Sequence, residues 1–583
     1  MVFVTYHYFL GLQTLDILAE TQRLIALDTG KRIDFNEIPL NDKDTFEHIF
    51  QTGKTGKVFQ FESSGMQNLL RRMKPTCMAD LCAANAAYRP GPMQFLDEFI
   101  NGRNNPDSVQ YPTPEYEQIA KETMGILFYQ EQIMQIVQAM AGFTLGQADI
   151  LRRGIGKKEK KYIDEGRERF VKGCAQLGTA DEKTAKYIYS TIEKFANYGF
   201  NKSHSDAYGL VAYWCAYLKE HFPECFMAAN LTICSHDVDR LAYALAETNR
   251  MGVSILPPDI RFSSSCFTLE STPTGQKAIR FSLAAIKSIR EENAEKYMQA
   301  DKRSLFHFLL SLPSGSVRKN QIVNLICAGA FDYLGARKAL IENLDALIDS
   351  IKMLNVLQTV AVPSCLSSFL LEDANNHFEY DMLTKLHKEK DCIQIALSGH
   401  PVSSVRNLTN MTTTLADYMG EDTTIEDSQE ITLLGMLSDY RTIQTKKGDT
   451  MAFAMLEDEF SSMDTVFFPR TYEELADTID DCLDMPVLIT GKLKLKDNFE
   501  GKPEYSLIVS DIEKVLKQSV AFFIDSRDMT DEMIGEMTKY NGLAEVYSVD
   551  VTNYTVQKLD FSVDINPAIL KMLKKVRCVV KKP

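Results

Sequence analysis

The sequence lacks the features that define several broad classes of protein. None of its 12 cysteines forms a CxxC pair, and no stretch makes a good membrane span. Zinc ribbons, thioredoxin-like sites and a membrane partner are therefore not expected. No basic lead precedes Asp16, which argues against a secretory signal, and scattered cysteines suit a reducing compartment. We expect a cytoplasmic protein.

The chain also lacks an excess of positive charge. It has 64 Lys and Arg against 79 Asp and Glu, a formal charge of −15, which excludes a generally basic nucleic-acid coat. A local basic groove remains compatible with nucleic acid, because phosphates respond to the field at their own position. With 45% hydrophobic residues the composition is that of a folded protein, and 583 residues predict about four domains.

The hydrophobic pattern changes along the chain. Residues up to about 260 have helical spacing, and a proline- and serine-rich stretch at 253–267 marks a boundary. Residues 431–512 follow the order strand, strand, strand, helix, strand, strand, which is the order of an OB-fold barrel. The sequence predicts a multidomain α+β protein: a mostly helical N-terminal part, a helical middle domain, a β-barrel OB-fold and a small C-terminal α/β region.

A row of lysines lies in the predicted barrel. Lys492, Lys494 and Lys496 alternate with leucines, so the period of a strand places the three lysines on one face. Such a face can follow the backbone of single-stranded nucleic acid. The alternative is a solvated edge strand that lysines protect from pairing.

The densest basic segment covers residues 152–161, where six of ten residues are Lys or Arg. Arginine grips phosphate oxygens with two N–H groups, lysine adds a point charge, and glycine lets the backbone approach closely. The GxxxxGK[ST] spacing of a Walker A loop is absent. The segment is either a phosphate site, carried by Arg152, Arg153, Lys157 and Lys158, or a solvated helix end.

A second candidate begins at Tyr198, where a polar loop with Lys202 and His204 leads into a helix. Ser205 or Asp206 is expected to cap this helix, and its free amides form a candidate anion site. The alternative is a capped core helix with a solvated lysine. The expected buried stripe is Ala207, Leu210, Val211, Trp214 and Leu218.

Two shorter segments are less specific. Prolines and a glycine after Arg89 predict a rigid turn that aims its guanidinium, although an ordinary turn explains the same residues. Residues 129–132 (YQEQ) lie in an amphipathic helix, where a capping or surface role is the simplest interpretation.

Taken together and in order, these segments resemble the bacterial replicative DNA polymerase III alpha subunit, from the end of its palm onward. The resemblance is carried by GKVFQFESSGM (56–66), AAYRPGPM (86–93), GILFYQEQIMQI (125–136), GFTLGQADILRRGIGKK (142–158), EKFANYGFNKSHSDAYGLVAYWCAYLK (193–219), ILPPDI (255–260), LICAGAFD (325–332), LSGHPV (397–402) and TKKGDTMAFAMLED (445–458).

The resemblance implies a C-family, template-directed DNA polymerase, a nucleotidyltransferase that acts in DNA replication. By similarity, Arg152 and Arg153 would grip the deoxynucleoside triphosphate, and four side chains would add positive potential: Lys157, Lys158, Lys202 and His204. Tyr208 and Arg89 would shape the nucleotide pocket. The complete enzyme uses Mg²⁺ held by three palm aspartates to activate the primer hydroxyl and stabilise the pyrophosphate.

The domains expected from the resemblance are a palm remnant (1–12), fingers (13–260), a helix-hairpin-helix-like and clamp-binding-like domain (263–425), an OB-fold (428–515) and a C-terminal domain (516–583). The expected partners are primer-template DNA, single-stranded template, deoxynucleoside triphosphates, the sliding clamp, a clamp-loader subunit and a palm-bearing polypeptide.

The sequence departs from the family at three places. Tyr8 stands where the third metal-binding aspartate is expected, before Phe9, and the other two aspartates belong upstream of residue 1. The matching hairpin at 286–292 (IKSIREE) lacks the family's glycines, which weakens amide contact with duplex phosphates. The nearest clamp-binding peptide, 364–370 (SCLSSFL), lacks the glutamine but keeps Phe369, so clamp binding and its loss both stay open.

Three interpretations remain. The chain is the C-terminal part of a replicative polymerase, or one half of a split polymerase, or a non-enzymatic module that binds single-stranded DNA or replisome partners. Palm motifs encoded directly upstream would favour either of the first two.

We predict that this chain alone does not polymerise DNA and binds no metal, because tyrosine is neutral at pH 7 and cannot replace a carboxylate between two Mg²⁺ ions. Purified chain should therefore leave a primed template unextended, with a complete DNA polymerase III alpha subunit as the positive control. Extension that EDTA abolishes and that co-purifies with this chain would contradict the prediction.

Overall fold

The structure is a computed structural model. It describes residues 11–581 except 158, 197, 314–317, 358–378, 381, 410–412, 419–428, 446–447, 460, 484, 496–504, 516–520, 554 and 564–566. The chain divides into two compact units, residues 1–233 with 246–253 and residues 234–245 with 254–583. Among the described residues, no helix combines the length and apolar character needed to cross a bilayer.

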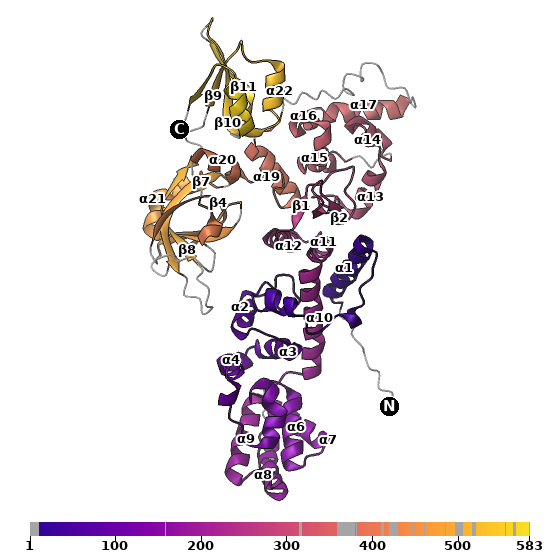
Figure 1. The fold of residues 1–583 in the computed structure, drawn as a ribbon, viewed down its shortest axis with the longest axis vertical. Coiled ribbons are helices and arrows are strands. Elements are labelled where there is room, and N and C mark those ends of the chain that lie inside the picture. Colours follow the sequence, from indigo (N-terminus) through magenta and orange to yellow (C-terminus); the bar gives the residue numbers. More distant parts are fainter. Residues whose placement is uncertain are drawn as a thin grey trace. The chain divides into compact units, whose positions relative to one another are not determined.

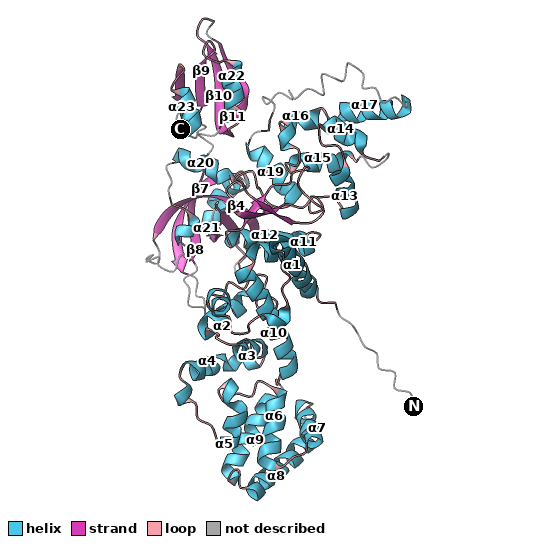
Figure 2. Cartoon of the chain, turned by 45° about the vertical axis from the view of Figure 1, so that its right-hand side comes forward, coloured by secondary structure: helices cyan, strands magenta, loops and turns pink. Residues whose placement is uncertain are grey.

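The first unit is helical, as the cyan ribbons of Figure 2 show. Its helices are α1 (Gln13–Thr29), α2 (Ser64–Met73), α3 (Met78–Ala87), α4 (Leu96–Asn104), α5 (Pro114–Ala120), α6 (Gln130–Ala141), α7 (Leu145–Gly156), α8 (Lys160–Leu177), α9 (Glu182–Ala196), α10 (Lys202–His221) and α11 (Pro223–Cys234); α12 (Val238–Arg250) contributes to both units. Helices α6, α7, α8 and α9 pack against one another (Figure 1). A parallel bridge joins Tyr129, just before α6, to Phe200, just before α10.

Helix α10 differs from the sequence expectation in its start and in its buried face. It begins at Lys202, and Asn201 caps it by accepting from the backbone N–H of His204 at 2.8 Å, so the expected cap at Ser205 or Asp206 is wrong. Of the expected buried stripe only Leu218 is fully buried. Leu210, Val211 and Trp214 are half-buried, and Ala207 is exposed.

Small side chains explain the shift of the buried face. Ser205, Gly209, Ala212 and Ala216 are buried, and α10 packs on the alanine-rich α3. A Cβ at Gly209 would lie 3.0 Å from Cys82 Sγ of α3, and Ser205 Oγ donates to the Cys82 carbonyl at 2.7 Å. Close approach of the two backbones therefore decides which face is buried, ahead of the larger apolar residues.

The second unit begins with a three-stranded sheet of order β1-β3-β2, formed by β1 (Ser254–Leu256), β2 (Thr268–Ser271) and β3 (Lys277–Arg280). The helices that follow are α13 (Glu291–Gln299), α14 (Leu305–Ser311), α15 (Lys319–Cys327), α16 (Arg337–Glu342), α17 (Leu344–Leu357), α19 (Met382–Ile393) and α20 (Pro401–Thr409). The buried guanidinium of Arg337 binds Glu389 at 2.9 Å and Asp332 at 2.7 Å, which ties α16 to α19.

The predicted OB-fold is confirmed as a closed barrel, drawn in orange in Figure 1. Its elements are β4 (Glu430–Gln444), β5 (Thr450–Glu457), β6 (Ser462–Phe467), α21 (Pro469–Asp480), β7 (Pro486–Leu495) and β8 (Tyr505–Lys514). The strand order around the barrel is β4-β5-β6-β8-β7, and β4 pairs with β7 to close it. Alternate apolar residues, such as Leu433, Leu456 and Leu493, fill the interior.

The C-terminal part has the element order strand, helix, strand, strand, helix, strand. These elements are β9 (Ala521–Asp525), α22 (Asp531–Met537), β10 (Asn541–Asp550), β11 (Thr555–Val563), α23 (Pro567–Leu573) and β12 (Cys578–Lys581). The sheet order is β11-β10-β9-β12, and a separate apolar core lies between the sheet and the two helices. The expected α+β architecture is thus confirmed through to the C-terminal region.

Residues 286–292, the hairpin that lacks the family's glycines, still form a turn. Ser288 has φ +68°, a left-handed conformation that favours glycine, and its carbonyl accepts from Gln321 Nε2 at 2.6 Å. Ile286 and Ile289 on either side are buried. The packing of the two isoleucines therefore holds a backbone conformation that serine adopts at a cost.

Replacing Ser288 with glycine should stabilise the protein by about 1 kcal/mol, because glycine adopts a left-handed φ without the steric cost of a Cβ. Chemical denaturation of wild type and S288G measures the difference. Ser288→Ala is the matched control and should leave stability near that of wild type. An S288G variant no more stable than S288A would contradict the strained turn.

Candidate functional site

The start of α10 is the point where the candidate residues of the first unit meet. Asn201 Nδ2 and the backbone N–H of Lys202 both donate to the carboxylate of Glu131, at 2.8 and 2.9 Å. We expected the free amides at the start of this helix to bind an anion, and the anion they bind is a carboxylate of the protein itself. Glu131 of the YQEQ segment supplies this carboxylate. The capping role expected for the segment is confirmed at Gln132, whose Oε1 accepts from the backbone N–H of Tyr129 at 3.0 Å.

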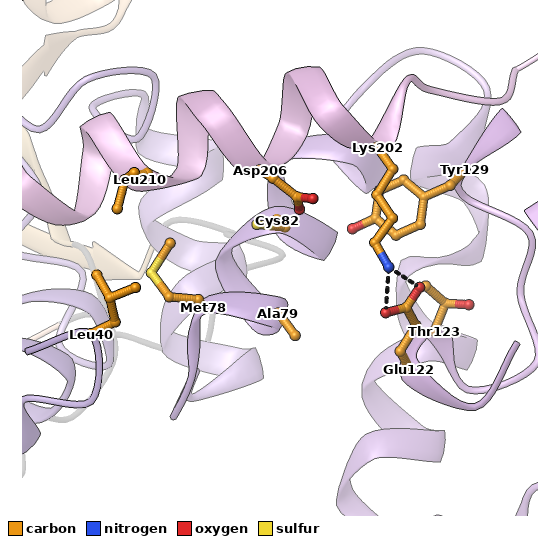
Figure 3. Close-up of a pocket in the computed structure, with 10 residues that line it drawn as sticks. All are labelled: Leu40, Met78, Ala79, Cys82, Glu122, Thr123, Tyr129, Lys202, Asp206 and Leu210. Atoms are coloured by element: carbon orange, nitrogen blue, oxygen red, sulfur yellow. Dashed lines mark hydrogen bonds and ion pairs between the residues drawn. The ribbon is translucent and has the colours of Figure 1, made fainter. Parts of the chain in front are cut away.

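Lys202 points into a pocket of about 340 Å³ beside α10 (Figure 3). The pocket is lined by Leu40, Met78, Ala79, Cys82, Glu122, Thr123, Tyr129, Lys202, Asp206 and Leu210. Lys202 Nζ lies 2.7 and 2.8 Å from the two carboxylate oxygens of Glu122. The pocket therefore has an ion pair at one end and apolar side chains at the other.

The thiol in this pocket stays protonated at neutral pH. Burial, followed by the hydrogen bond to Asp206, raises the pKa of Cys82 to about 12. Because the thiolate is the nucleophilic form, Cys82 is not a reactive cysteine. The polar chemistry of the pocket rests on Lys202 and the two carboxylates, Glu122 and Asp206.

Arg152 and Arg153 share one carboxylate. Arg152 Nη2 lies 2.8 Å from Asp149 Oδ1, and Arg153 Nε lies 2.9 Å from Asp149 Oδ2. Hydrogen bonds from Arg153 and then Arg152 lower the pKa of Asp149 to about 2. The side chain of Arg153 is 65% exposed and that of Arg152 23%, so both guanidinium groups are reachable from solvent.

The remaining predicted residues are Arg89, His204 and Tyr208. His204 lies on the opposite side of α10 from Lys202, since two helical positions turn by about 200°. The Arg89 guanidinium carbon lies 3.6 Å from the centre of the Phe200 ring. The ring centre of His204 lies 5.3 Å from that of Phe200 in an edge-on contact and 4.1 Å from that of Tyr208, with the rings of His204 and Tyr208 tilted by 31°. Burial lowers the pKa of Arg89, but an arginine remains charged at neutral pH.

One loop connects the two sides. Gln130 donates from Nε2 to the Gly199 carbonyl at 2.8 Å, and its Oε1 accepts from Arg152 Nη1 at 3.0 Å. Phe200, the residue after Gly199, makes the contact with Arg89. The structure therefore brings Arg89, Arg152, Lys202 and His204 to the loop at 198–202 or to the residues that hold it.

Other predicted residues are placed differently. Lys157 is exposed at the C-terminal end of α7, whereas Lys158, Tyr8 and Phe369 lie outside the described residues. Sequence reasoning missed the partners Glu122, Glu131 and Asp149. The sequence held one signal for the role of Asp149. It lies three residues before Arg152 and four before Arg153, and side chains at these spacings meet on a helix.

The lysine face of the barrel is confirmed where it is described. Lys492 and Lys494 are exposed and Leu493 is buried, whereas Lys496 is outside the described residues. The edge-strand alternative is excluded at Lys492, where β7 pairs with Glu430 of β4 and with Ile508 of β8. At Lys494 the described pairing is with Ser506 of β8, so both interpretations stay open there.

A second feature of the barrel surface was missed from the sequence. Phe453 on β5 is half-buried and pairs in register with Arg441 on β4, whose guanidinium carbon lies 5.8 Å from the ring centre. An outward aromatic ring beside an arginine on this part of an OB-fold is typical of surfaces on which bases stack. The alternation along β5 was the signal that could have found it.

Metal ligands are not gathered in the described part of the chain. Among those residues, no group of three or more His, Cys, Asp or Glu side chains is placed to hold a metal ion. The site in the first unit is instead a set of basic side chains, of which Lys202, Arg152 and Arg153 lie beside carboxylates and Arg89 lies over an aromatic ring.

Comparison with known proteins places this geometry in a class. The family model of the bacterial DNA polymerase III alpha subunit finger domain matches residues 14–178, a helix-hairpin-helix motif matches 252–340, and an OB-fold nucleic acid binding domain matches 431–515. The chain is therefore built from modules that also occur in a replicative DNA polymerase.

Comparison with individual relatives identifies the protein family. DNA polymerase III subunit alpha of Treponema pallidum is 34% identical over 566 residues, which is 94% of this chain and 47% of that protein. The Aquifex aeolicus subunit is 36% identical over 83% of this chain and 40% of its own length. The Bacillus subtilis subunit is 32% identical over 91% of this chain and 47% of its own length. The chain belongs to the DNA polymerase III alpha subunit family, and it spans less than half the length of these relatives.

Proposed function

We propose that this chain supplies the nucleotide-binding fingers and the DNA-binding modules of a template-directed DNA polymerase. The observation that carries the proposal is the convergence of Arg89, Arg152 and His204 on the loop before α10, with Lys202 adding positive potential from the other side of that helix. A triphosphate carries several negative charges that such a set can neutralise. The substrate is a deoxynucleoside triphosphate paired to the template.

The carboxylates explain how such a site is kept in the absence of substrate. Glu122, Glu131 and Asp149 hold the cations and the helix amides in place, and incoming phosphate oxygens would compete for the same N–H groups. The chain's residues bind and orient the triphosphate. Lys157 and Lys158 add positive potential, and Arg153 is the second arginine of the grip.

The Mg²⁺ of the complete polymerase does not fit the described residues of this chain, which hold no cluster of carboxylates, and Tyr8 occupies the expected aspartate position. No step is therefore derived through a metal here. In this proposal the fingers, residues 13–260, meet a palm that carries the metal-binding aspartates, and residues 1–12 correspond to the end of that palm.

Contacts beyond the substrate belong to the second unit. The middle region, 263–425, would hold duplex phosphates at its hairpin and offer Phe369 to a sliding clamp. The barrel at 428–515 would bind the single-stranded template. A clamp-loader subunit is a further expected partner, with no residues assigned to it. The closed barrel with its lysine face supports the template role. It also supports the second candidate, a single-stranded DNA-binding module without catalysis.

Opposite effects of two substitutions test the triphosphate site. Arg152→Ala should weaken the affinity for a deoxynucleoside triphosphate about tenfold, because charged hydrogen bonds are lost. Asp149→Asn should strengthen it several-fold, because the competing carboxylate is removed. Isothermal titration measures both, with the exposed Asp164→Asn on α8 as the matched control. Affinity unchanged in both variants would refute the site.

The barrel face is tested with an oligo-dT strand over a range of salt concentrations. The double variant Lys492→Ala, Lys494→Ala should reduce the slope of log affinity against log salt concentration by about 1.4, because each lost phosphate contact accounts for about 0.7. Phe453→Ala should weaken binding about tenfold and leave the salt slope unchanged, because stacking is not ionic. Lys571→Ala on α23 is the control, and wild-type behaviour of all three variants would exclude this face.

A further inference from the structure

Gln130, the first residue of α6, makes three hydrogen bonds that link separate parts of the first unit. Its side-chain nitrogen donates to the Gly199 carbonyl at 2.8 Å, and its backbone N–H donates to the Phe200 carbonyl at 2.9 Å. Its side-chain oxygen accepts from Arg152 Nη1 of α7 at 3.0 Å. The amide of Gln130 thus spans the gap between the loop before α10 and the Arg152 guanidinium.

The hydrogen bonds of Arg152 show what this contact controls. A guanidinium has five N–H groups, of which two bind Asp149 and one binds Gln130. One N–H is left on each terminal nitrogen, and each of these can donate to a phosphate oxygen. Asp149 fixes one side of the group and Gln130 the other, so together they set the direction in which the remaining N–H groups point.

Glutamine suits this position for chemical reasons. It both donates to a carbonyl and accepts from an arginine, and it carries no charge that would repel phosphate. The loop fits closely against it, because a Cβ at Gly199 would lie 3.1 Å from Gln130 Cγ. A glutamate would keep the acceptor for Arg152 but lose the donor to Gly199 and add a negative charge.

We propose that Gln130 is a positioning residue for triphosphate binding, which holds the Arg152 guanidinium in register with the loop at 198–202. The inference rests on the proposed role of Arg152. Gln130 acts through Arg152 and makes no contact with the ligand. Its effect on affinity therefore depends on the presence of the arginine, unlike the effect of a residue that only stabilises the fold.

A double-mutant cycle on the full chain tests this dependence, with inorganic tripolyphosphate as the probe in isothermal titration. Gln130→Met keeps the side-chain length and removes both side-chain hydrogen bonds. We expect it to weaken tripolyphosphate binding about three- to tenfold in the wild-type background and by less than about twofold when Arg152 is already alanine. Gln135→Met, an exposed position on the same helix, should have no effect.

Gln130→Glu is the second variant and guards against a folding defect in the first. It should also weaken binding in the wild-type background, while thermal unfolding of both variants stays close to that of wild type. Equal losses in both arginine backgrounds, or no loss in either variant while Arg152→Ala still weakens binding, would overturn the role of Gln130 alone. No effect of Arg152→Ala would overturn the triphosphate site and this inference with it.

Discussion

The geometry of the first unit depends on how the loop before α10 is fixed. Backbone hydrogen bonds join Phe200 to Phe128 and Gln130, and the carboxylate of Glu131 closes over the first amides of α10. These contacts come from residues about 70 positions earlier in the chain. Without them Phe200, Lys202 and His204 would have no fixed relation to Arg152, because that arginine lies on a separate helix.

Each cation around this loop has an anionic or aromatic partner within the protein. Lys202 is beside Glu122, the two arginines are beside Asp149, and Arg89 lies over the Phe200 ring. A group of like charges repels itself, and these partners reduce the repulsion while they orient the groups. In the proposed triphosphate site, phosphate oxygens would replace these carboxylates, which would make binding sensitive to salt and to the charge of the ligand.

Much of the architecture was readable from the sequence, because strand alternation and turn residues are local signals. The barrel follows from the order of its strands, and the outward direction of Lys492 and Lys494 follows from the period of two. The buried face of α10 was not readable, because small residues at Ser205 and Gly209 decide it through contact with α3. Hydrophobic periodicity gives little weight to glycine and serine.

In the candidate site, too, some features could be predicted from the sequence and others depend on the fold. The cationic residues were found because their types and spacing are unusual in an acidic chain, and a resemblance supplied their order. Their partners Glu122 and Gln130 are distant in sequence from the cations they hold, and only the fold brings them together. The conformation of Ser288 was also out of reach, since packing imposes it on a residue that does not favour it.

The most direct test of the central idea is an experimental structure of the chain with a deoxynucleoside triphosphate bound. The account predicts phosphate oxygens within hydrogen-bonding distance of the Arg152 guanidinium, on the side of α10 that carries His204, with Asp149 displaced from at least one arginine. A triphosphate bound elsewhere, with the pairs of Asp149 intact, would contradict it.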